Sequence, residues 1–114
     1  MITGTGIDIV NIKRIKKSLS TYGDKFMQKI LSVKEIENIP SVKKEEFIAG
    51  RFAAKEALVK ASGVSLTFSE ITILNDADGK PSIVELPKDI GNQKIHLSIS
   101  HDSDYAAAIV IIEK

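Results

Sequence analysis

The sequence contains no cysteine and no tryptophan, and it has only two tyrosines and four phenylalanines. Without cysteine the chain has no disulfide, no thiol nucleophile and no zinc-thiolate site, so packing alone must stabilise it. The shortage of aromatic rings argues against a surface on which nucleic-acid bases stack. These absences exclude thiol chemistry, and we expect no nucleic-acid partner.

Long apolar runs are also missing. The longest, such as Ala106–Ile112, are far below the roughly twenty residues that a membrane-spanning helix needs. The start, MITGTGIDIV, lacks the basic stretch followed by an apolar block that marks a signal peptide, so we expect a cytoplasmic protein. With 114 residues and a net charge of +1, the chain has room for a single domain, residues 1–114, with one core.

A long central helix organises the rest of the sequence. It is expected to start at about Lys43, after Pro40, and to end at Gly63, which favours a left-handed cap. The segment Arg51–Gly63, RFAAKEALVKASG, forms its main part. At 100° per residue its apolar stripe consists of Phe47, Ala54, Leu58 and Ala61, widened by Ile48, Phe52 and Val59.

A second flank of this helix carries Ala49, Ala53, Glu56 and Lys60. Small residues at the first two positions allow a backbone or a ligand to approach closely. Glu56 and Lys60 are four residues apart, so they are placed to pair with each other. Taken alone, such a pair is typical of a solvent-exposed surface and worth about a few tenths of a kcal/mol.

The other elements follow from apolar periodicity, caps and turn residues. Helices are expected over Ile12–Tyr22, Lys25–Leu31 and a short segment that the capping box Ser32-Val33-Lys34-Glu35 opens. Strands are expected over Ile2–Val10, Leu66–Leu74, Ser82–Leu86, Lys94–Ser100 and Tyr105–Glu113, with hairpin turns at Asp78-Gly79 and residues 101–104. This order predicts an α+β domain in which a mainly antiparallel sheet packs on the long central helix.

Asp8 stands out within the first expected strand. Strand alternation puts it on one face with Gly4 and Gly6, in the middle of apolar sequence, where a carboxylate is costly unless something pairs with it. A capping role is less suitable, because Asn11 is better placed to cap the next helix. Mg²⁺ prefers a few carboxylates together with water and phosphate oxygens, so Asp8 and Glu56 are candidate ligands.

Positive charge is concentrated early in the chain. Between Asn11 and Lys34 there are seven basic residues and one acid, Asp24. A solvated helix face accounts for this excess in the simplest way. The functional alternative is a docking surface for an acidic partner, reached through long-range electrostatic steering.

The run Ser100-His101-Asp102 is not interpreted as a catalytic triad. Adjacent residues of a strand point to opposite faces, and the sequence contains no GxSxG elbow. His101 nevertheless lies where a strand enters a turn, a position that often carries function.

Three segments occur together at a specific spacing: Gly6-Ile7-Asp8-Ile9, Arg51–Gly63 and His96–Ala108 (HLSISHDSDYAAA). Ala49-Gly50 and Asp78-Gly79-Lys80-Pro81 extend the pattern over nearly the whole chain. The combination GxDI…RFAAKEAxxKAxG…SISH resembles that of the small bacterial 4′-phosphopantetheinyl transferases, the holo-(acyl-carrier-protein) synthase family. The resemblance implies the fold of that family.

The resemblance also implies a reaction and its partners. Coenzyme A would donate its 4′-phosphopantetheine arm to a serine of apo acyl carrier protein in a Mg²⁺-dependent step, releasing adenosine 3′,5′-bisphosphate and supporting fatty acid biosynthesis. Arg14 matches a basic residue of the first helix that docks the acidic carrier, and Lys13 and Lys17 lie beside it. The resemblance further implies a homotrimer with active sites between the subunits.

The site residues are carried over position by position. Asp8 and Glu56 match the Mg²⁺ ligands, and Lys60 matches a lysine near the pyrophosphate, so these three residues are the expected catalytic group. Arg51 and His101 match residues near the nucleotide end, where the 3′-phosphate lies. Either Glu56 or a metal-bound water would take the serine proton.

One segment departs from the family pattern. The family continues KAxGTGI, whereas Ser62–Leu66 is shorter here and lacks the second glycine. Two other functions remain as alternatives: a non-catalytic basic module that binds an acidic protein partner, and a Mg²⁺-dependent phosphohydrolase that uses water in place of serine.

Overall fold

The computed structural model describes all residues from Met1 to Lys114. The helices are α1 (Ile12–Tyr22), α2 (Asp24–Ile30), α3 (Val33–Glu37) and α4 (Lys44–Ser62). The strands are β1 (Ile2–Asn11), β2 (Thr72–Asn75), β3 (Pro81–Glu85), β4 (Lys94–His101) and β5 (Tyr105–Glu113). Two short 3₁₀ turns, η1 (Phe68–Glu70) and η2 (Lys88–Ile90), complete the chain.

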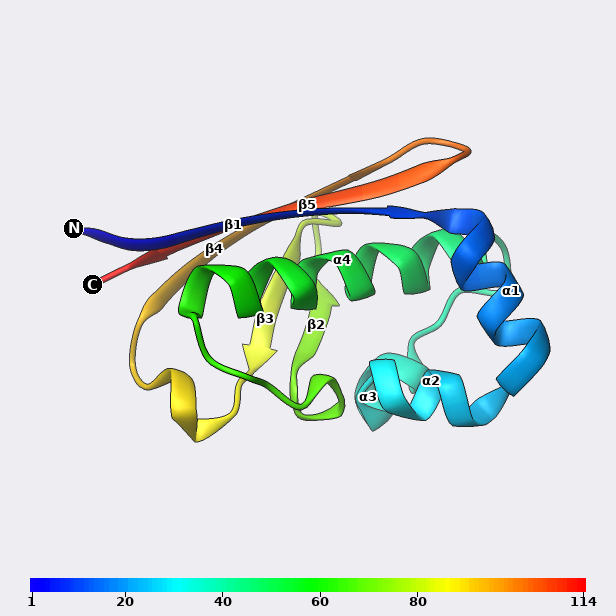
Figure 1. The fold of residues 1–114 in the computed structure, drawn as a ribbon, viewed down its shortest axis with the longest axis horizontal. Helices are drawn as coiled ribbons and strands as arrows, with labels where there is room; N and C mark the ends of the chain where they lie inside the picture. Colours follow the sequence, from blue (N-terminus) through cyan, green and yellow to red (C-terminus); the bar gives the residue numbers. More distant parts are fainter.

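All strand pairs are antiparallel, and they form two sheets. The larger sheet has the order β1-β5-β4, and the smaller one pairs β2 with β3. Helix α4 runs below the larger sheet, while α1, α2 and α3 gather at one end of the molecule (Figure 1). The expected α+β fold, with an antiparallel sheet packed on a long central helix, is confirmed.

Strand β1 lies very close to α4. A Cβ atom built on Gly6 would stand 1.9 Å from the carbonyl oxygen of Ala57, and one built on Gly4 would stand 1.9 Å from that of Ala61. Only glycine fits at both positions, which explains why β1 interrupts its β-branched residues with two glycines. The close approach expected on the small-residue flank of the helix is therefore made in part by a strand of the same chain.

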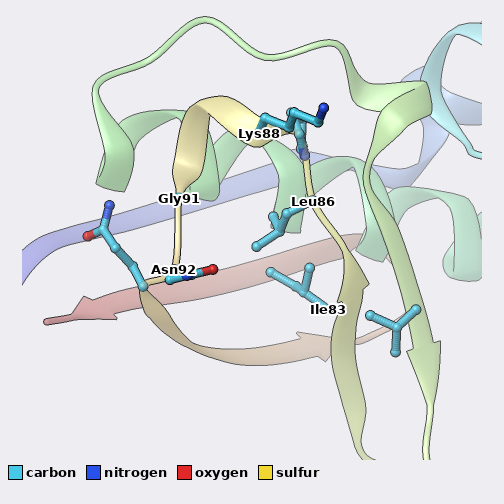
Figure 2. Close-up of a pocket in the computed structure, with 8 residues that line it drawn as sticks. Ile83, Leu86, Lys88, Gly91 and Asn92 are labelled. Carbon is cyan, nitrogen blue, oxygen red and sulfur yellow. The ribbon is translucent and has the colours of Figure 1, made fainter.

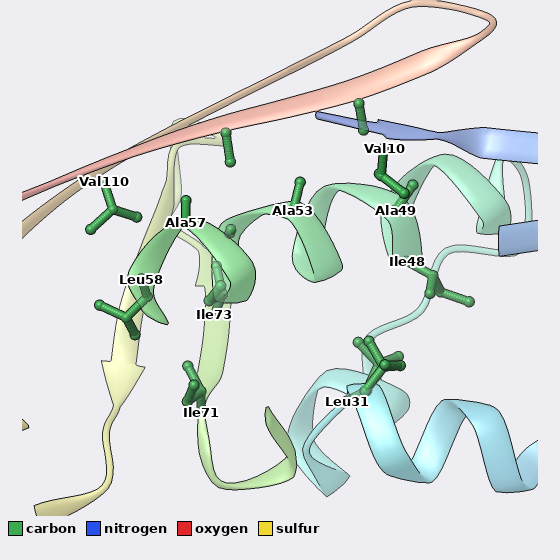
Figure 3. Close-up of a cluster of buried hydrophobic side chains, with 14 of the residues drawn as sticks. Val10, Leu31, Ile48, Ala49, Ala53, Ala57, Leu58, Ile71, Ile73 and Val110 are labelled. Atoms are coloured by element: carbon green, nitrogen blue, oxygen red, sulfur yellow. The ribbon is translucent and has the colours of Figure 1, made fainter. Parts of the chain in front are cut away.

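The core surrounds α4 on more than one side. Figure 3 shows Ala49, Ala53 and Ala57 toward the larger sheet, and Ile48 and Leu58 toward the other elements. The expected apolar stripe was wrong in part: Phe47 and Ala61 are only partly buried, whereas Ala49, Ala53 and Ala57, which lie outside that stripe, are completely buried. Helix α4 is covered by the larger sheet above and by α1 and α2 below, and Arg51 connects it to β2, so burial extends around much of its circumference.

Most predicted boundaries are confirmed. Gly63 adopts a left-handed conformation with φ of 70° and ends α4, and the Asn11 side chain caps α1 by accepting from the Lys13 amide at 2.9 Å. The capping box between Ser32 and Glu35 is present in full.

The predicted strand Leu66–Leu74 is wrong in its first half. Residues 68–70 form η1, and β2 begins only at Thr72. The Phe68 ring packs edge-on against Phe52, with ring centroids 5.9 Å apart, and the Phe68 carbonyl accepts a hydrogen bond from Lys55 at 2.9 Å. Tertiary contacts thus override the local β propensity of this segment.

The outer face of the larger sheet carries an uncovered apolar patch on β1 and β5. Ile7 and Ile9 of β1 are each 66% exposed, and Tyr105 and Ile109 of β5 are also exposed. Ile7 and Ile109 are direct cross-strand neighbours. No helix of this fold has both the length and the apolar character required to cross a membrane.

Candidate functional site

The structure brings Asp8 and Lys60 into contact. Asp8 points from β1 toward α4 with 17% of its side chain exposed, and the Lys60 ammonium donates to its Oδ1 atom at 3.2 Å and to the Ile7 carbonyl at 2.9 Å. The carboxylate that the sequence placed in apolar surroundings is therefore paired. Because more than half of the Lys60 side chain is exposed, the ion pair contributes about 0–1 kcal/mol to stability.

Glu56 lies one helical turn before Lys60 on the same flank of α4. The pairing that their spacing allows is not formed, because Lys60 turns to Asp8 and the Ile7 carbonyl instead. The neighbouring strand offers the ammonium two acceptors, whereas Glu56 offers one carboxylate along the helix surface. Glu56 is partly buried and makes no ion pair within the chain, so its carboxylate remains available to a ligand.

The side chains of Asp8 and Glu56 are suited to Mg²⁺, which binds few protein atoms, and not to a metal whose ligands all come from the protein. Nowhere do three or more His, Cys, Asp or Glu side chains gather closely enough to hold an ion. Two carboxylates beside a lysine leave room for water and phosphate oxygens, which is the arrangement that Mg²⁺ favours. Asp8 and Glu56 fit such a site by the chemistry of their oxygen atoms.

Arg51 is turned into the protein interior rather than toward Asp8. Its side chain is stacked 4.1 Å above the Phe47 ring, and its Nη2 atom donates to Asn75 Oδ1 at 3.1 Å and to the Ile73 carbonyl at 3.3 Å. Only 6% of the residue is exposed, and its buried Nε has no partner. Burial lowers the pKa of Arg51, and the charge of Glu35 opposes this effect. Arg51 thus fastens β2 to α4 within the chain.

His101 lies at the other end of α4 from Lys60. Its Nδ1 atom is 3.2 Å from the carboxylate of Glu46, in the first turn of the helix. Glu46 precedes Glu56 by ten residues, which corresponds to about 15 Å along the helix axis. Within one chain, His101 therefore does not join Asp8, Glu56 and Lys60. A polar pocket lies nearby, lined by Ile12, Lys13, Lys16, Lys43, Glu45, Glu46 and Ser103.

The predicted docking residues form an exposed basic surface. Lys13, Arg14 and Lys17 all project from α1 into solvent. Beside them, a groove between α1 and α2 is lined by Ser18, Tyr22, Lys25, Phe26, Lys29 and Ile30. The groove combines apolar and positively charged side chains, which suits an acidic amphipathic partner.

Another pocket lies where β3 leads into η2 and β4, and it includes Ile83, Leu86, Lys88 and Asn92 (Figure 2). It contains no carboxylate and no histidine, so it lacks the groups of the predicted site.

Sequence reasoning missed one charged pair next to the site. Lys55 and Glu35 are completely buried and form an ion pair. Burial lowers the pKa of Lys55, whereas the charge of Glu35 and its hydrogen bond act in the opposite direction. The available signal was that Arg51 and Lys55 occupy the same helix face as Ile48 and Leu58, where solvent-facing charges are not expected.

Comparisons with known proteins show the family to which the chain is similar. A family model described as the 4′-phosphopantetheinyl transferase superfamily matches residues 4–110. A holo-[acyl-carrier-protein] synthase of Maridesulfovibrio salexigens is 45% identical over 124 residues, covering 100% of both chains.

Solved structures give the same result. The holo-[acyl-carrier-protein] synthase of Neisseria meningitidis superimposes with a TM-score of 0.91 at 37% identity, covering 100% of both chains. A holo-(acyl-carrier-protein) synthase of Bacillus anthracis in complex with CoA (3′,5′-ADP) has a TM-score of 0.83 at 40% identity, covering 98% of this chain and 96% of that one.

Proposed function

This chain belongs to the 4′-phosphopantetheinyl transferase superfamily, and we propose that it transfers 4′-phosphopantetheine from coenzyme A to a serine of apo acyl carrier protein. The serine oxygen bonds to the phosphorus that carries the pantetheine arm. The bond from that phosphorus to the bridging pyrophosphate oxygen breaks, and adenosine 3′,5′-bisphosphate leaves. The observation that carries this proposal is the full-length match to holo-[acyl-carrier-protein] synthases, together with the Asp8–Lys60 contact beside Glu56.

Asp8 and Glu56 would hold Mg²⁺, which neutralises charge on the diphosphate of coenzyme A when it is bound. Lys60 is well suited to a second positive charge at this place. Its ammonium is more than half exposed, so it reaches toward a diphosphate at little cost in desolvation. There it opposes the negative charge that builds on the leaving oxygen. The serine proton passes to Glu56 or to a water at the site.

The nucleotide end of coenzyme A is proposed to lie near His101. Arg51 is the other residue predicted at this end, but its side chain is buried against Phe47 and Asn75, so it would have to turn outward to reach the nucleotide. Because His101 stands about 15 Å along α4 from Glu56 in one chain, two subunits would have to combine these groups. The exposed apolar face of β1 and β5, which includes Ile7 and Ile109, is suited to burial against a second copy. These features support an assembly of several copies with active sites between subunits, and the number proposed from the family resemblance is three.

The carrier protein is proposed to dock on α1. Lys13, Arg14 and Lys17 are exposed there, and the adjoining groove offers apolar contacts beside lysines. A positive surface steers an acidic carrier to the site and fixes its register. We place the enzyme in the cytoplasm, where it would supply holo carrier protein for fatty acid biosynthesis.

The test is the mass of the carrier protein after incubation with the enzyme, coenzyme A and Mg²⁺. We expect the carrier to gain one phosphopantetheine group, and we expect chelation of Mg²⁺ to prevent the gain. Glu56→Gln should lower the rate about 100-fold or more, because a charged metal ligand is lost from the site, together with the general base if Glu56 takes the serine proton. The matched control is Glu70→Gln, which removes an exposed carboxylate outside the site.

An unmodified carrier with the native enzyme would contradict the transferase proposal. Salt-sensitive binding of the carrier without Mg²⁺ or coenzyme A would then favour the basic binding module. Release of adenosine 3′,5′-bisphosphate without a carrier would favour the phosphohydrolase.

A further inference from the structure

The buried ion pair between Lys55 and Glu35 connects four parts of the molecule. The Lys55 ammonium donates to Glu35, to the Ile30 carbonyl at 2.8 Å and to the Phe68 carbonyl at 2.9 Å. All three of its protons are used, so the charge is fully compensated without water. The partners come from the end of α2, from α3 and from η1.

Glu35 is equally well satisfied. One of its oxygens accepts from the Ser32 amide at 2.9 Å, and the other accepts from the Ile73 amide at 3.0 Å. The carboxylate therefore links α3 and β2 directly to the lysine of α4. A buried pair of this quality resists displacement, because moving either partner leaves an uncompensated charge in the interior.

Lys55 immediately precedes Glu56, so the two side chains leave α4 about 100° apart. A rotation of α4 that releases Lys55 from Glu35 would also turn Glu56 and Lys60 away from β1. On the side of α4 toward the larger sheet the buried side chains are alanines, which lack long interlocking side chains, so the buried ion pair adds a specific rotational constraint to the packing of Ile48, Leu58 and β1.

We infer that Lys55 and Glu35 form a positioning pair that fixes the rotation of α4 and so directs Glu56 and Lys60 toward Asp8. This inference rests on the proposed transferase function. Ile30 connects the pair to the carrier surface as well, because it lines the groove between α1 and α2 while its carbonyl accepts from Lys55. The docking helices and the site on α4 thus share one buried anchor.

The test uses the double variant Glu35→Gln/Lys55→Met. Both charges disappear together, and the methionine fills the space of the lysine stem. The glutamine oxygen still accepts from one of the Ser32 and Ile73 amides, and its NH₂ group takes the place of the other carboxylate oxygen. We expect a folded protein whose kcat falls about tenfold or more and whose half-saturating Mg²⁺ concentration rises about tenfold. The KM for coenzyme A should change less than kcat, because the nucleotide end is bound elsewhere.

The matched control is Thr72→Val. Thr72 is buried and bonds to Ser32 and Glu85, so its replacement removes buried hydrogen bonds without touching α4. It should lower the Tm and leave kcat and the Mg²⁺ dependence of the folded enzyme unchanged. A double variant that behaves in the same way would show that the ion pair only stabilises the fold.

A second readout does not depend on transfer. We expect amide hydrogen exchange in residues 51–60 and in β1 to be faster in the double variant than in Thr72→Val, when each protein is measured the same number of degrees below its own Tm. Unchanged protection would overturn the positioning role even if the native chain proves inactive, whereas inactivity of the native chain overturns only the proposed function. If the double variant does not fold, the same measurements are made on Glu35→Asp, which keeps the carboxylate charge on a shorter side chain. The same results are expected, and the same contrary results would overturn the inference.

Discussion

Glycine at positions 4 and 6 is what allows β1 to lie against α4 closely enough for the Lys60 ammonium to reach both the Ile7 carbonyl and Asp8. A single added methyl group at either glycine would overlap a helix carbonyl. At the scale of residues, the candidate site therefore depends on two positions that carry no functional group at all.

Gly6→Ala should destabilise the fold by about 3 kcal/mol or more, because its Cβ would stand 1.9 Å from a backbone oxygen that cannot rotate away. Equilibrium denaturation in urea measures the change in the free energy of unfolding. The neighbouring Thr5→Val serves as the control, since Thr5 is exposed and valine suits a strand; it should change stability by less than about 0.5 kcal/mol. Equal stability of the Gly6→Ala variant and the native chain would contradict the close packing.

At the scale of elements, α1 and the turn between β4 and β5 carry charges whose effects differ. Helix α1 presents Lys13, Arg14 and Lys17 to solvent, where their charges act at long range on a partner. The turn instead holds its aspartate by short local hydrogen bonds, which act only within the fold.

Arg14→Glu should raise the KM for the carrier protein about tenfold and leave the KM for coenzyme A nearly unchanged. The reversed charge repels the acidic carrier, and the effect should shrink as salt is added. Steady-state kinetics at low and high ionic strength measures both quantities. Lys88→Glu in η2 makes the same change of net charge away from α1 and should have little effect. A parallel rise of both KM values would refute docking at this position.

Asp102 is predicted to make the turn sensitive to acid. The amides of Tyr105 and Asp104 each donate to its Oδ1 at 2.7 Å, and these bonds lower the pKa of Asp102 below its ordinary value of 3.8. A lowered pKa means that the stabilisation is present above pH 3.8 and is lost as the pH falls through the pKa of the folded state.

The measurement compares the stability of the native chain and Asp102→Asn between pH 6 and pH 3. Asparagine keeps the acceptor oxygen and loses the charge, so the difference between the two proteins should be largest near pH 6 and shrink toward pH 3. A difference that stays constant as the pH falls would mean that the pKa of Asp102 is not lowered, and a difference that grows would mean that it is raised.

At the scale of the whole molecule, the larger sheet is covered by α4 on one face only. The other face exposes Ile7, Ile9 and Ile109, which is unusual for a sheet that ends at solvent, because exposed faces are normally polar. The wide separation of His101 from Glu56 in one chain gives the same indication. If several copies of the chain meet through this face, the exposed isoleucines become buried and His101 of one copy can lie near Glu56 of another.

Ile109→Lys should therefore convert a trimer into monomers and reduce transfer strongly, because a buried unpaired ammonium is costly at an interface. Light scattering coupled to size-exclusion chromatography gives the molar mass, and the carrier assay gives the activity. Val84→Lys is the control, since Val84 is exposed on β3, outside the larger sheet. A native chain that is monomeric and active would overturn the assembly.

The sequence alone determined the helices and most of the strands, because caps, glycines and apolar periodicity act over a few residues. Through a family resemblance, it also predicted that Asp8, Glu56 and Lys60 act as a group, and the structure brings Asp8 and Lys60 into contact. It misplaced the start of β2, where the position of Phe68 depends on contacts with Phe52 and Lys55 that are distant in sequence.

Only the tertiary structure decided which charges meet. Lys60 pairs with Asp8 rather than with Glu56, Arg51 turns inward to Asn75, and Lys55 is buried against Glu35. These choices depend on the packing of α4 between a sheet and three small helices, and local spacing contains no information about it. Arg51 and Lys55 are buried, and they bind the partners that the fold brings near because the cost of burying an unpaired charge exceeds any preference set by the sequence.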